Sequence, residues 1–307
     1  TTEIYTLSLH DALPILWFPM MHTTDSHLLS RKITRRVFAT GIGLAVAGLG
    51  ARLPLYAQSG RWLEVRRLSG SVTYRGGSVR AARTGDRLTQ GGHGLYTSSG
   101  SSAVLSIDGS VGTVTVAENT RFSVQQLGIT ADGAYVTILS VTQGQVRVQA
   151  QPFTNPNTRL ELHTPSGVSA VRGTEFGVSI SNNGKNGIGT LEGSVDFSAQ
   201  GESVQVGAGF ASIALPGEAP IQPIPLDREL ALNLTHFDRR GPSLHVHGQI
   251  NAANTLLIGD HEVEIDRSGA FTAVFPVSQN YWVMTFKVRN PLGEERQHRV
   301  QIGRAHV

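Results

Sequence analysis

Alternation between apolar and polar residues is the feature that most constrains the fold of this chain. It runs through short segments rich in β-branched residues, such as 111–116 (VGTVTV), 135–139 (YVTIL) and 145–150 (QVRVQA). A period of two places successive side chains on opposite faces of a strand, whereas a helix repeats every ~3.6 residues. Asp-Gly and Asn-Gly dipeptides, typical of tight hairpin turns, stand at 108–109, 132–133, 183–184 and 186–187. The sequence therefore predicts an all-β fold.

A short glycine motif recurs between these segments. Gly70, Gly144 and Gly193 each stand two residues before a valine that would point into the core. A glycine in a strand often marks a bulge or a close approach of another backbone. The spacings between the three glycines are unequal, which argues against a regular solenoid. We expect either a β-sandwich with bulged strands or stacked β-rungs of unequal length.

A proline-rich segment divides the chain into two β-regions. Residues 214–225 (ALPGEAPIQPIP) contain four prolines, which interrupt strand ladders and stiffen linkers. We predict a β-domain over residues 58–215, a linker over 216–242 and a small immunoglobulin-like β-sandwich over 243–301. The last region is short for such a sandwich, which usually needs about 100 residues.

Both ends of the chain resemble the translation of a sequencing adapter, at residues 1–15 (TTEIYTLSLHDALPI) and 302–307 (IGRAHV). Such segments are excluded from the fold. The whole chain has a net charge of +3, but residues 58–301 hold 20 basic and 20 acidic residues. A neutral body lacks the basic surface expected of a nucleic-acid-binding protein.

Residues 20–57 have the layout of a secretory signal peptide, with basic residues, an apolar stretch and a small-residue cleavage site at Ala57. Arg35 and Arg36 stand in a TRRVF sequence that resembles the twin-arginine export motif. The apolar stretch is shorter than the ~20 residues of a spanning helix, so a retained anchor is the less favoured alternative. We expect a periplasmic or extracellular protein that meets the membrane only during export.

No recognisable catalytic motif is present in the sequence. The absence of cysteine excludes disulfide bonds and thiolate chemistry, and there is no G-x-S-x-G, H-E-x-x-H or P-loop pattern. Asp108 and Glu118 could supply the two carboxylates of a glycosidase, but a hairpin turn explains Asp108 more simply. We therefore expect no cofactor, and favour a non-enzymatic protein over a glycan-active enzyme.

Two rows of possible metal ligands lie in the second β-region. His245 and His247 share one face of a strand and could bind zinc together with His261 or Glu262. An acidic row that could attract calcium consists of Glu262, Glu264 and Asp266. Neither row completes a ligand set of known spacing, so solvated strand faces are the favoured interpretation.

The segment 164–176 (TPSGVSAVRGTEF) and the preceding 103–110 (AVLSIDGS) carry a specific resemblance. Together with 190–195 (TLEGSV), they make residues 61–215 resemble the FecR family, named for an iron-dicitrate regulator of the bacterial envelope. The motif positions are Asp108, Gly109, Thr164, Pro165, Arg172, Gly173, Thr174 and Phe176.

Members of that family typically place a sensing domain in the periplasm, where it responds to an outer-membrane transporter and restrains a sigma factor across the membrane. The resemblance implies that residues 58–215 form an envelope β-domain that binds an envelope protein in signal sensing or regulation. The alternative is a surface adhesion or polysaccharide-binding protein, with the immunoglobulin-like region as a spacer. Arg172 either contacts the partner or, as we favour, pairs with Glu175 or caps backbone carbonyls.

Overall fold

The computed structural model describes residues 60–108, 110–276 and 282–302 of the chain. All regular structure in these residues is β-strand, which confirms the all-β prediction. The predicted signal peptide, with Arg35, Arg36 and Ala57, lies outside the described residues. Gly109 and the adapter-like segments, apart from Ile302, also lie outside them.

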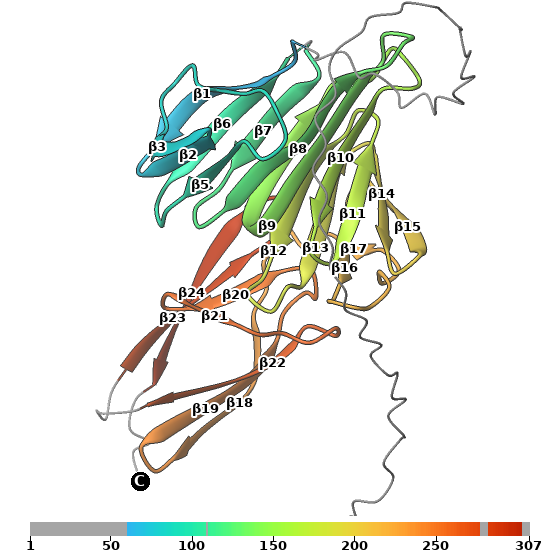
Figure 1. Ribbon diagram of the computed structural model, residues 1–307. Helices are drawn as coiled ribbons and strands as arrows, with labels where there is room; N and C mark the ends of the chain where they lie inside the picture. Colours follow the sequence, from blue (N-terminus) through green and yellow to red (C-terminus); the bar gives the residue numbers. More distant parts are fainter. Residues whose placement is uncertain (1–59, 109, 277–281, 303–307) are drawn as a thin grey trace, which may run out of the picture. The chain divides into compact units, whose positions relative to one another are not determined.

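Seventeen strands form one hydrogen-bonded network, which we call the N-terminal sandwich (Figure 1). The network folds into two open sheets that share strand β9. Sheet A runs in the order β4 (Arg87–Leu88), β1 (Leu63–Ser69), β6 (Ser102–Ile107), β7 (Gly112–Val116), β9 (Tyr135–Ala150), β12 (Glu175–Ile180), β13 (Asn186–Glu192), β16 (Phe210–Ala214) and β17 (Ile224–Pro225). Sheet B runs in the order β3 (Ser78–Ala81), β2 (Val72–Gly76), β5 (Gly94–Thr97), β8 (Arg121–Ile129), β9, β10 (Arg159–Thr164), β11 (Gly167–Val171), β14 (Ser194–Ala199) and β15 (Glu202–Gly207).

Strand β9, with 16 residues, holds the two sheets together. Its first half pairs with β8 and, in parallel, with β10, so it belongs to sheet B. Its second half pairs with β7 and β12, so it belongs to sheet A. The long arrow of β9 is seen between these neighbours in Figure 1. One strand therefore supplies a central member of both layers.

The inward side chains of both sheets form a single core. Strand β6 alternates between partly exposed and buried residues along its whole length, as the period of two predicts. Phe176 from sheet A and Phe197 from sheet B are fully buried in this core. The N-terminal sandwich is thus stabilised by apolar contact between its two layers.

The recurring glycines mark corners where the chain crosses from one sheet to the other. Gly70 joins β1 to β2 and Gly193 joins β13 to β14, while Gly144 lies at the crossing within β9. All three have positive φ angles, of 70°, 76° and 89° respectively. The valines two residues later are buried, as expected: Val72, Val146 and Val195. Because hairpins within a sheet separate the corners, their spacing in the sequence is unequal.

Some of the predicted Asp-Gly and Asn-Gly turns are found in the structure and one is not. Gly133, with φ of 81°, donates to the Thr130 carbonyl in a turn, and the 183–184 dipeptide connects β12 to β13. The predicted turn at Asn186-Gly187 is wrong, because both residues lie in β13. A Cβ on Gly187 would lie 2.8 Å from the Ala253 carbonyl oxygen, so this glycine permits a close approach rather than a turn.

Residues of the predicted linker 216–242 are ordered along sheet A and beyond it. Ile221 donates its backbone N–H to the Ile213 carbonyl at 2.9 Å, and β17 pairs with β16. Strand β18 begins at Asn233. An apolar cluster packs this segment between strand β16 and two loops of the C-terminal region. Its buried members are Ala211, Ile213, Leu226, Ala252, Ala253 and Leu292.

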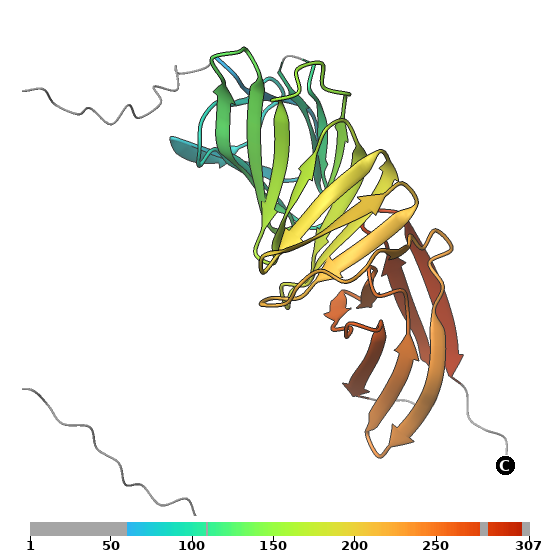
Figure 2. The same ribbon diagram turned by 90° about the vertical axis from the view of Figure 1, so that its right-hand side faces the viewer.

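Seven further strands form the C-terminal sandwich. Sheet C contains β18 (Asn233–Arg240), β19 (Ser243–Gln249) and β22 (Ala270–Pro276). Sheet D contains β21 (His261–Val263), β20 (Thr255–Ile258), β23 (Trp282–Arg289) and β24 (Glu295–Ile302). Figure 2 shows the orange strands β18 and β19 in one layer and the red strands β23 and β24 in the other. The two layers enclose a separate core, and the immunoglobulin-like relationship stays a prediction.

We predict that Gly144→Ala destabilises the protein more than Gly133→Ala does. Both glycines have positive φ, which costs an alanine about 1–2 kcal/mol. A Cβ at Gly144 would also lie 2.3 Å from Thr120 Oγ1 and 2.7 Å from the Asn119 carbonyl oxygen, whereas a Cβ at Gly133 meets nothing within 4 Å. Urea unfolding of the two variants checks this. Equal losses in the free energy of unfolding would contradict the crowded corner at β9.

Candidate functional site

The motif residues at 164–176 build the turn and the corner on either side of strand β11. Thr164 Oγ1 donates to the Gly167 carbonyl at 2.9 Å across the turn that contains Pro165. At the other end, Thr174 Oγ1 donates to the Ser194 carbonyl at 2.9 Å. Gly173 has φ of 103°, and a Cβ there would lie 2.5 Å from Pro152 Cα. These motif residues therefore shape the backbone rather than line a cavity.

Arg172 is the motif residue that the fold leaves free. Its side chain is exposed, and no ion pair or hydrogen bond joins it to the described residues. The favoured pairing with Glu175 is wrong: Glu175 Oε1 accepts from Arg147 Nε at 2.8 Å, and the two residues form an ion pair. Strand β9 lies beside β12, so Arg147 reaches Glu175 across the sheet.

A buried ion pair, missed at the sequence level, lies near the start of the N-terminal sandwich. Arg61 Nη2 donates to Asp108 Oδ1 at 2.8 Å, and the two side chains are 1% and 9% exposed. Arg61 Nη1 also donates to the Val136 carbonyl at 3.0 Å, and the guanidinium lies 4.5 Å from the ring centre of Tyr135. Asp108 lies in the turn between β6 and β7, as expected, and its side chain also neutralises a buried cation that binds strand β9.

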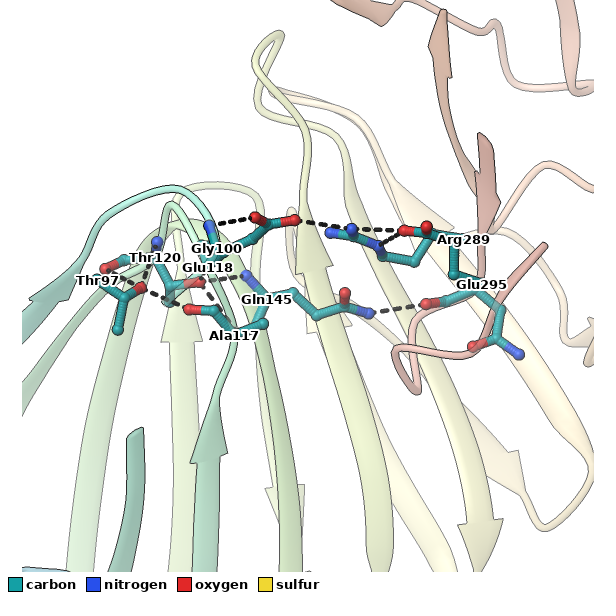
Figure 3. Close-up of polar contacts among 9 residues, drawn as sticks. Thr97, Gly100, Ala117, Glu118, Thr120, Gln145, Arg289 and Glu295 are labelled. Carbon is teal, nitrogen blue, oxygen red and sulfur yellow. Dashed lines mark hydrogen bonds and ion pairs between the residues drawn. The ribbon is translucent and has the colours of Figure 1, made fainter. Parts of the chain in front are cut away.

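The two sandwiches meet at the corner of β9, where Figure 3 shows a chain of polar contacts. Gln145 Nε2 donates to the Asn290 carbonyl at 2.7 Å and to the Pro291 carbonyl at 2.9 Å. Glu118 Oε1 accepts from Arg289 Nη2 at 2.9 Å, and its Oε2 accepts from the Gly100 N–H at 2.7 Å. The bond from Gly100 and then that from Arg289 lower the pKa of Glu118.

Hollows of about 620 Å³ and 260 Å³ flank these contacts, and both are lined by Glu118, Gln145 and Arg289. The larger one has the size of a small-molecule site. Its charged groups are already matched, because Arg289 also pairs with Glu295 at 2.6 Å and Arg147 pairs with Glu175. Asp108 and Glu118 each pair with a different arginine, so they do not form a carboxylate couple for glycoside hydrolysis. The junction is built to hold two sandwiches together.

Three glycines of sheet A form a smooth platform beneath the C-terminal sandwich. Gly177 and Gly189 are opposite each other on β12 and β13, and Gly187 follows on the same face. A Cβ on Gly177 would lie 2.0 Å from the Pro291 carbonyl oxygen, and one on Gly189 would lie 2.8 Å from Leu226 Cδ1. No side chain fits there, so the loop at 290–292 rests on the sheet backbone.

Lys185 is buried beside this platform. Its Nζ donates to the Ala252 carbonyl at 3.0 Å and to the Asn254 carbonyl at 2.8 Å, and its residue exposure is 1%. Burial lowers the pKa of the ammonium from 10.5 to about 7, while the charge of Glu262 opposes this shift. The neutral amine has two N–H groups, which match the two carbonyls.

The possible metal ligands of the C-terminal sandwich have other contacts. His247 Nδ1 lies 3.0 Å from Thr272 Oγ1, and its ring packs against His236. Asp266 accepts the N–H groups of Ser268 and Ala270 in a turn. Within residues 60–108, 110–276 and 282–302, no three His, Asp or Glu side chains are grouped to hold a metal ion.

Residues 93–196 match the model of the FecR protein family. The chain contains a FecR domain. The match spans the motif from Asp108 to Phe176, and the domain lies wholly within the N-terminal sandwich. No curated protein matches the chain.

Solved structures show a weaker likeness to the FecR-domain chain. Two crystal structures of a candidate anti-sigma factor from Parabacteroides distasonis share 12% identity with it, at a TM-score of 0.33. The match covers 43% and 44% of this chain, and 61% and 62% of those chains. A polysaccharide lyase shares 9% identity at a TM-score of 0.19, over 83% of this chain and 42% of its own. The chain thus spans less than two thirds of each neighbour.

The described part of the FecR-domain chain has no helix with the length and hydropathy needed to cross a membrane.

We predict that Asp108→Ala costs about 3–5 kcal/mol in the free energy of unfolding, because it leaves the buried Arg61 charge without a partner. A matched control is Glu218→Ala, which breaks an ion pair with Arg267 whose side chains are 45% and 49% exposed. Such surface pairs contribute at most about 1 kcal/mol. Chemical denaturation of both variants measures the difference, and similar losses would show that Arg61 finds water or another acceptor.

We predict that Lys185 makes the folded state more stable as the pH rises. Between the folded pKa of about 7 and the unfolded value of 10.5, the unfolded chain binds more protons than the folded chain. The free energy of unfolding therefore increases with pH across this window, by up to about 1.4 kcal/mol per pH unit. Lys185→Met should flatten this slope in urea unfolding at a series of pH values. An unchanged slope would assign the dependence to other groups.

Proposed function

We propose that this chain is an exported, non-enzymatic FecR-domain protein that binds another component of the cell envelope in a sensing or regulatory role. The observation that carries this proposal is the FecR match over residues 93–196. The family resemblance implies a domain that recognises a partner outside the cytoplasm. The satisfied charges of Asp108, Glu118 and Glu175 also favour binding over acid–base catalysis, because each carboxylate is already paired with an arginine.

The predicted signal peptide supports a periplasmic or extracellular location. The segment 20–57 has the order of a signal peptide, and Arg35 and Arg36 resemble a twin-arginine motif. The neutral charge of residues 58–301 suits neither nucleic acid nor an anionic membrane surface. In this proposal the protein meets the membrane only during its export.

The contact with a protein partner is centred on Arg172. Its neighbours are fixed, because Gly173 turns the backbone, Thr174 is bonded to Ser194 and Phe176 is buried. A guanidinium that is exposed on a rigid corner and has no carboxylate partner in the described chain is ready to bind an acidic group. Such charge-assisted hydrogen bonds are about twice as strong as neutral ones.

A second candidate function is that of a surface adhesion or polysaccharide-binding protein. It is favoured by a hollow on sheet B whose lining contains two arginines and a tyrosine but no carboxylate. The C-terminal sandwich, held by Gln145 and Lys185, would then fix the orientation of the FecR domain.

Chemical crosslinking of the full chain in the envelope of its own cells tests the proposed function. We expect the wild type and the control Arg67→Glu, another exposed arginine without a partner in the described chain, to capture the same envelope protein. Arg172→Glu should reduce this capture at least ten-fold. The mature N-terminus of the captured chain should lie near Gln58.

Equal capture by Arg172→Glu would place the contact elsewhere. Recovery of the chain from the cytosol with Met21 retained would contradict an envelope function.

A further inference from the structure

The outer face of sheet B has a hollow of about 460 Å³ across β3, β2, β5 and β8. Cross-strand register places Thr73, Tyr96 and Arg121 in one row. The neighbouring row consists of Val79, Arg75, Gly94 and Ser123. The side chains of Arg75, Tyr96 and Arg121 are exposed on this face.

Gly94 is the residue that makes the surface hollow. It lies between Arg75 and Ser123 in its row and contributes no side chain. A Cβ on Gly94 would lie 2.3 Å from the Phe122 carbonyl oxygen and 3.0 Å from Ser123 Cβ. The strand packing thus imposes a gap in the middle of the face, beside the ring of Tyr96.

The charge of the hollow is unbalanced. Its lining contains two arginines and no carboxylate. Neither Arg75 nor Arg121 forms an ion pair with the described residues, and the Arg121 guanidinium lies 5.6 Å from the ring centre of Tyr96. By contrast, Arg80, on the adjoining edge strand, pairs with Asp86 at 2.7 Å. The two unpaired guanidinium groups therefore favour the binding of an anionic ligand.

The position of the hollow narrows the class of this ligand. Strands β2, β5 and β8 have a hydrogen-bonded neighbour on both sides, so a peptide cannot pair with their backbones as an added strand. Recognition over these three strands therefore uses side chains on the flat face of the sheet, and only the edge strand β3 is open to an added strand. Arg75 and Arg121 are separated by one strand and stand in neighbouring rows, which places their Cα atoms about 10 Å apart across the strands and about 7 Å apart along them.

We propose that this hollow binds an acidic polysaccharide whose sugar units carry carboxylates. A sugar ring stacks on the exposed Tyr96, which is 37% accessible. Arg75 and Arg121 bind carboxylates of units on either side of this ring, with the bidentate geometry that guanidinium favours. The hydroxyl groups of Thr73, Ser123 and Thr142 line the hollow and can donate to and accept from sugar hydroxyls.

This inference goes beyond the protein partner proposed for Arg172, because it concerns a different surface and a different kind of ligand. Loss of one interaction would leave the other intact. Crosslinking of the protein partner therefore tests only the first proposal, and glycan titration tests only the second.

Isothermal titration of the full chain with oligogalacturonate, at low salt, tests whether the hollow binds an acidic polysaccharide. We expect saturable binding that Arg75→Gln and Arg121→Gln each weaken at least ten-fold. Tyr96→Ser should also weaken binding at least ten-fold through the lost stacking. The matched control Arg67→Gln removes an exposed, unpaired arginine from β1, outside the hollow, and should bind as the wild type does. A neutral oligosaccharide of equal length should bind at least ten-fold more weakly. Unchanged melting temperatures would show that all variants remain folded.

Two results would overturn the proposal. One is the absence of binding to oligogalacturonate, or binding that both arginine variants retain. The other is equally tight binding of a polyglutamate peptide with the same dependence on Arg75 and Arg121, which would assign the hollow to acidic peptides.

Discussion

The passage of strand β9 from one sheet to the other at Gly144 is the constraint on which the rest of the structure depends. The turn leaves polar backbone groups that need partners inside the protein. Thr120 Oγ1 accepts from the Gln145 N–H at 2.9 Å and lies 3.2 Å from the Gln145 carbonyl oxygen. The Gln145 side chain then reaches two carbonyls of the C-terminal sandwich. One corner thus joins two sheets of the first sandwich and anchors the second.

Charge is distributed unequally over this framework. Arg61 and Lys185 are buried at positions where their hydrogen bonds fix a specific arrangement, at a cost in desolvation. Several exposed arginines have a carboxylate partner, as Arg80 has in Asp86. Arg75, Arg121 and Arg172 have none among the described residues, and each projects from a strand or corner that the backbone holds rigidly. Because the backbone at these positions is already held by the sheet or the corner, only the arginine side chain has to be ordered when a ligand binds.

The sequence predicted the strands well because a period of two is a local property. It predicts the inward valines correctly, and it predicts a bulge or a close backbone approach at the glycines before them. A Cβ at Gly144 would lie 2.7 Å from the Asn119 carbonyl oxygen, and one at Gly193 would lie 2.9 Å from the Gly173 carbonyl oxygen, so the close approach is found. The crossing between sheets has no local signal, because it depends on strands distant in the chain. Asn186-Gly187 was mistaken for a turn because a close approach of Ala253 also requires a glycine. The Arg61–Asp108 pair, 47 residues apart, left no local signal. The register across sheet B, which brings Arg75, Tyr96 and Arg121 together, also has no local signal in the sequence.

The FecR motif and the candidate binding surfaces serve different physical tasks. Gly173, Thr174 and Phe176 turn the chain, bond the corner and fill the core, so altering them would change the fold itself. Tyr96 and Arg121 lie within the matched domain but point away from the core. Substitution of such outward residues leaves the strand ladder intact, because each ladder bond uses backbone atoms only. A sandwich of this kind can therefore change its ligand without losing the motif by which its domain is recognised.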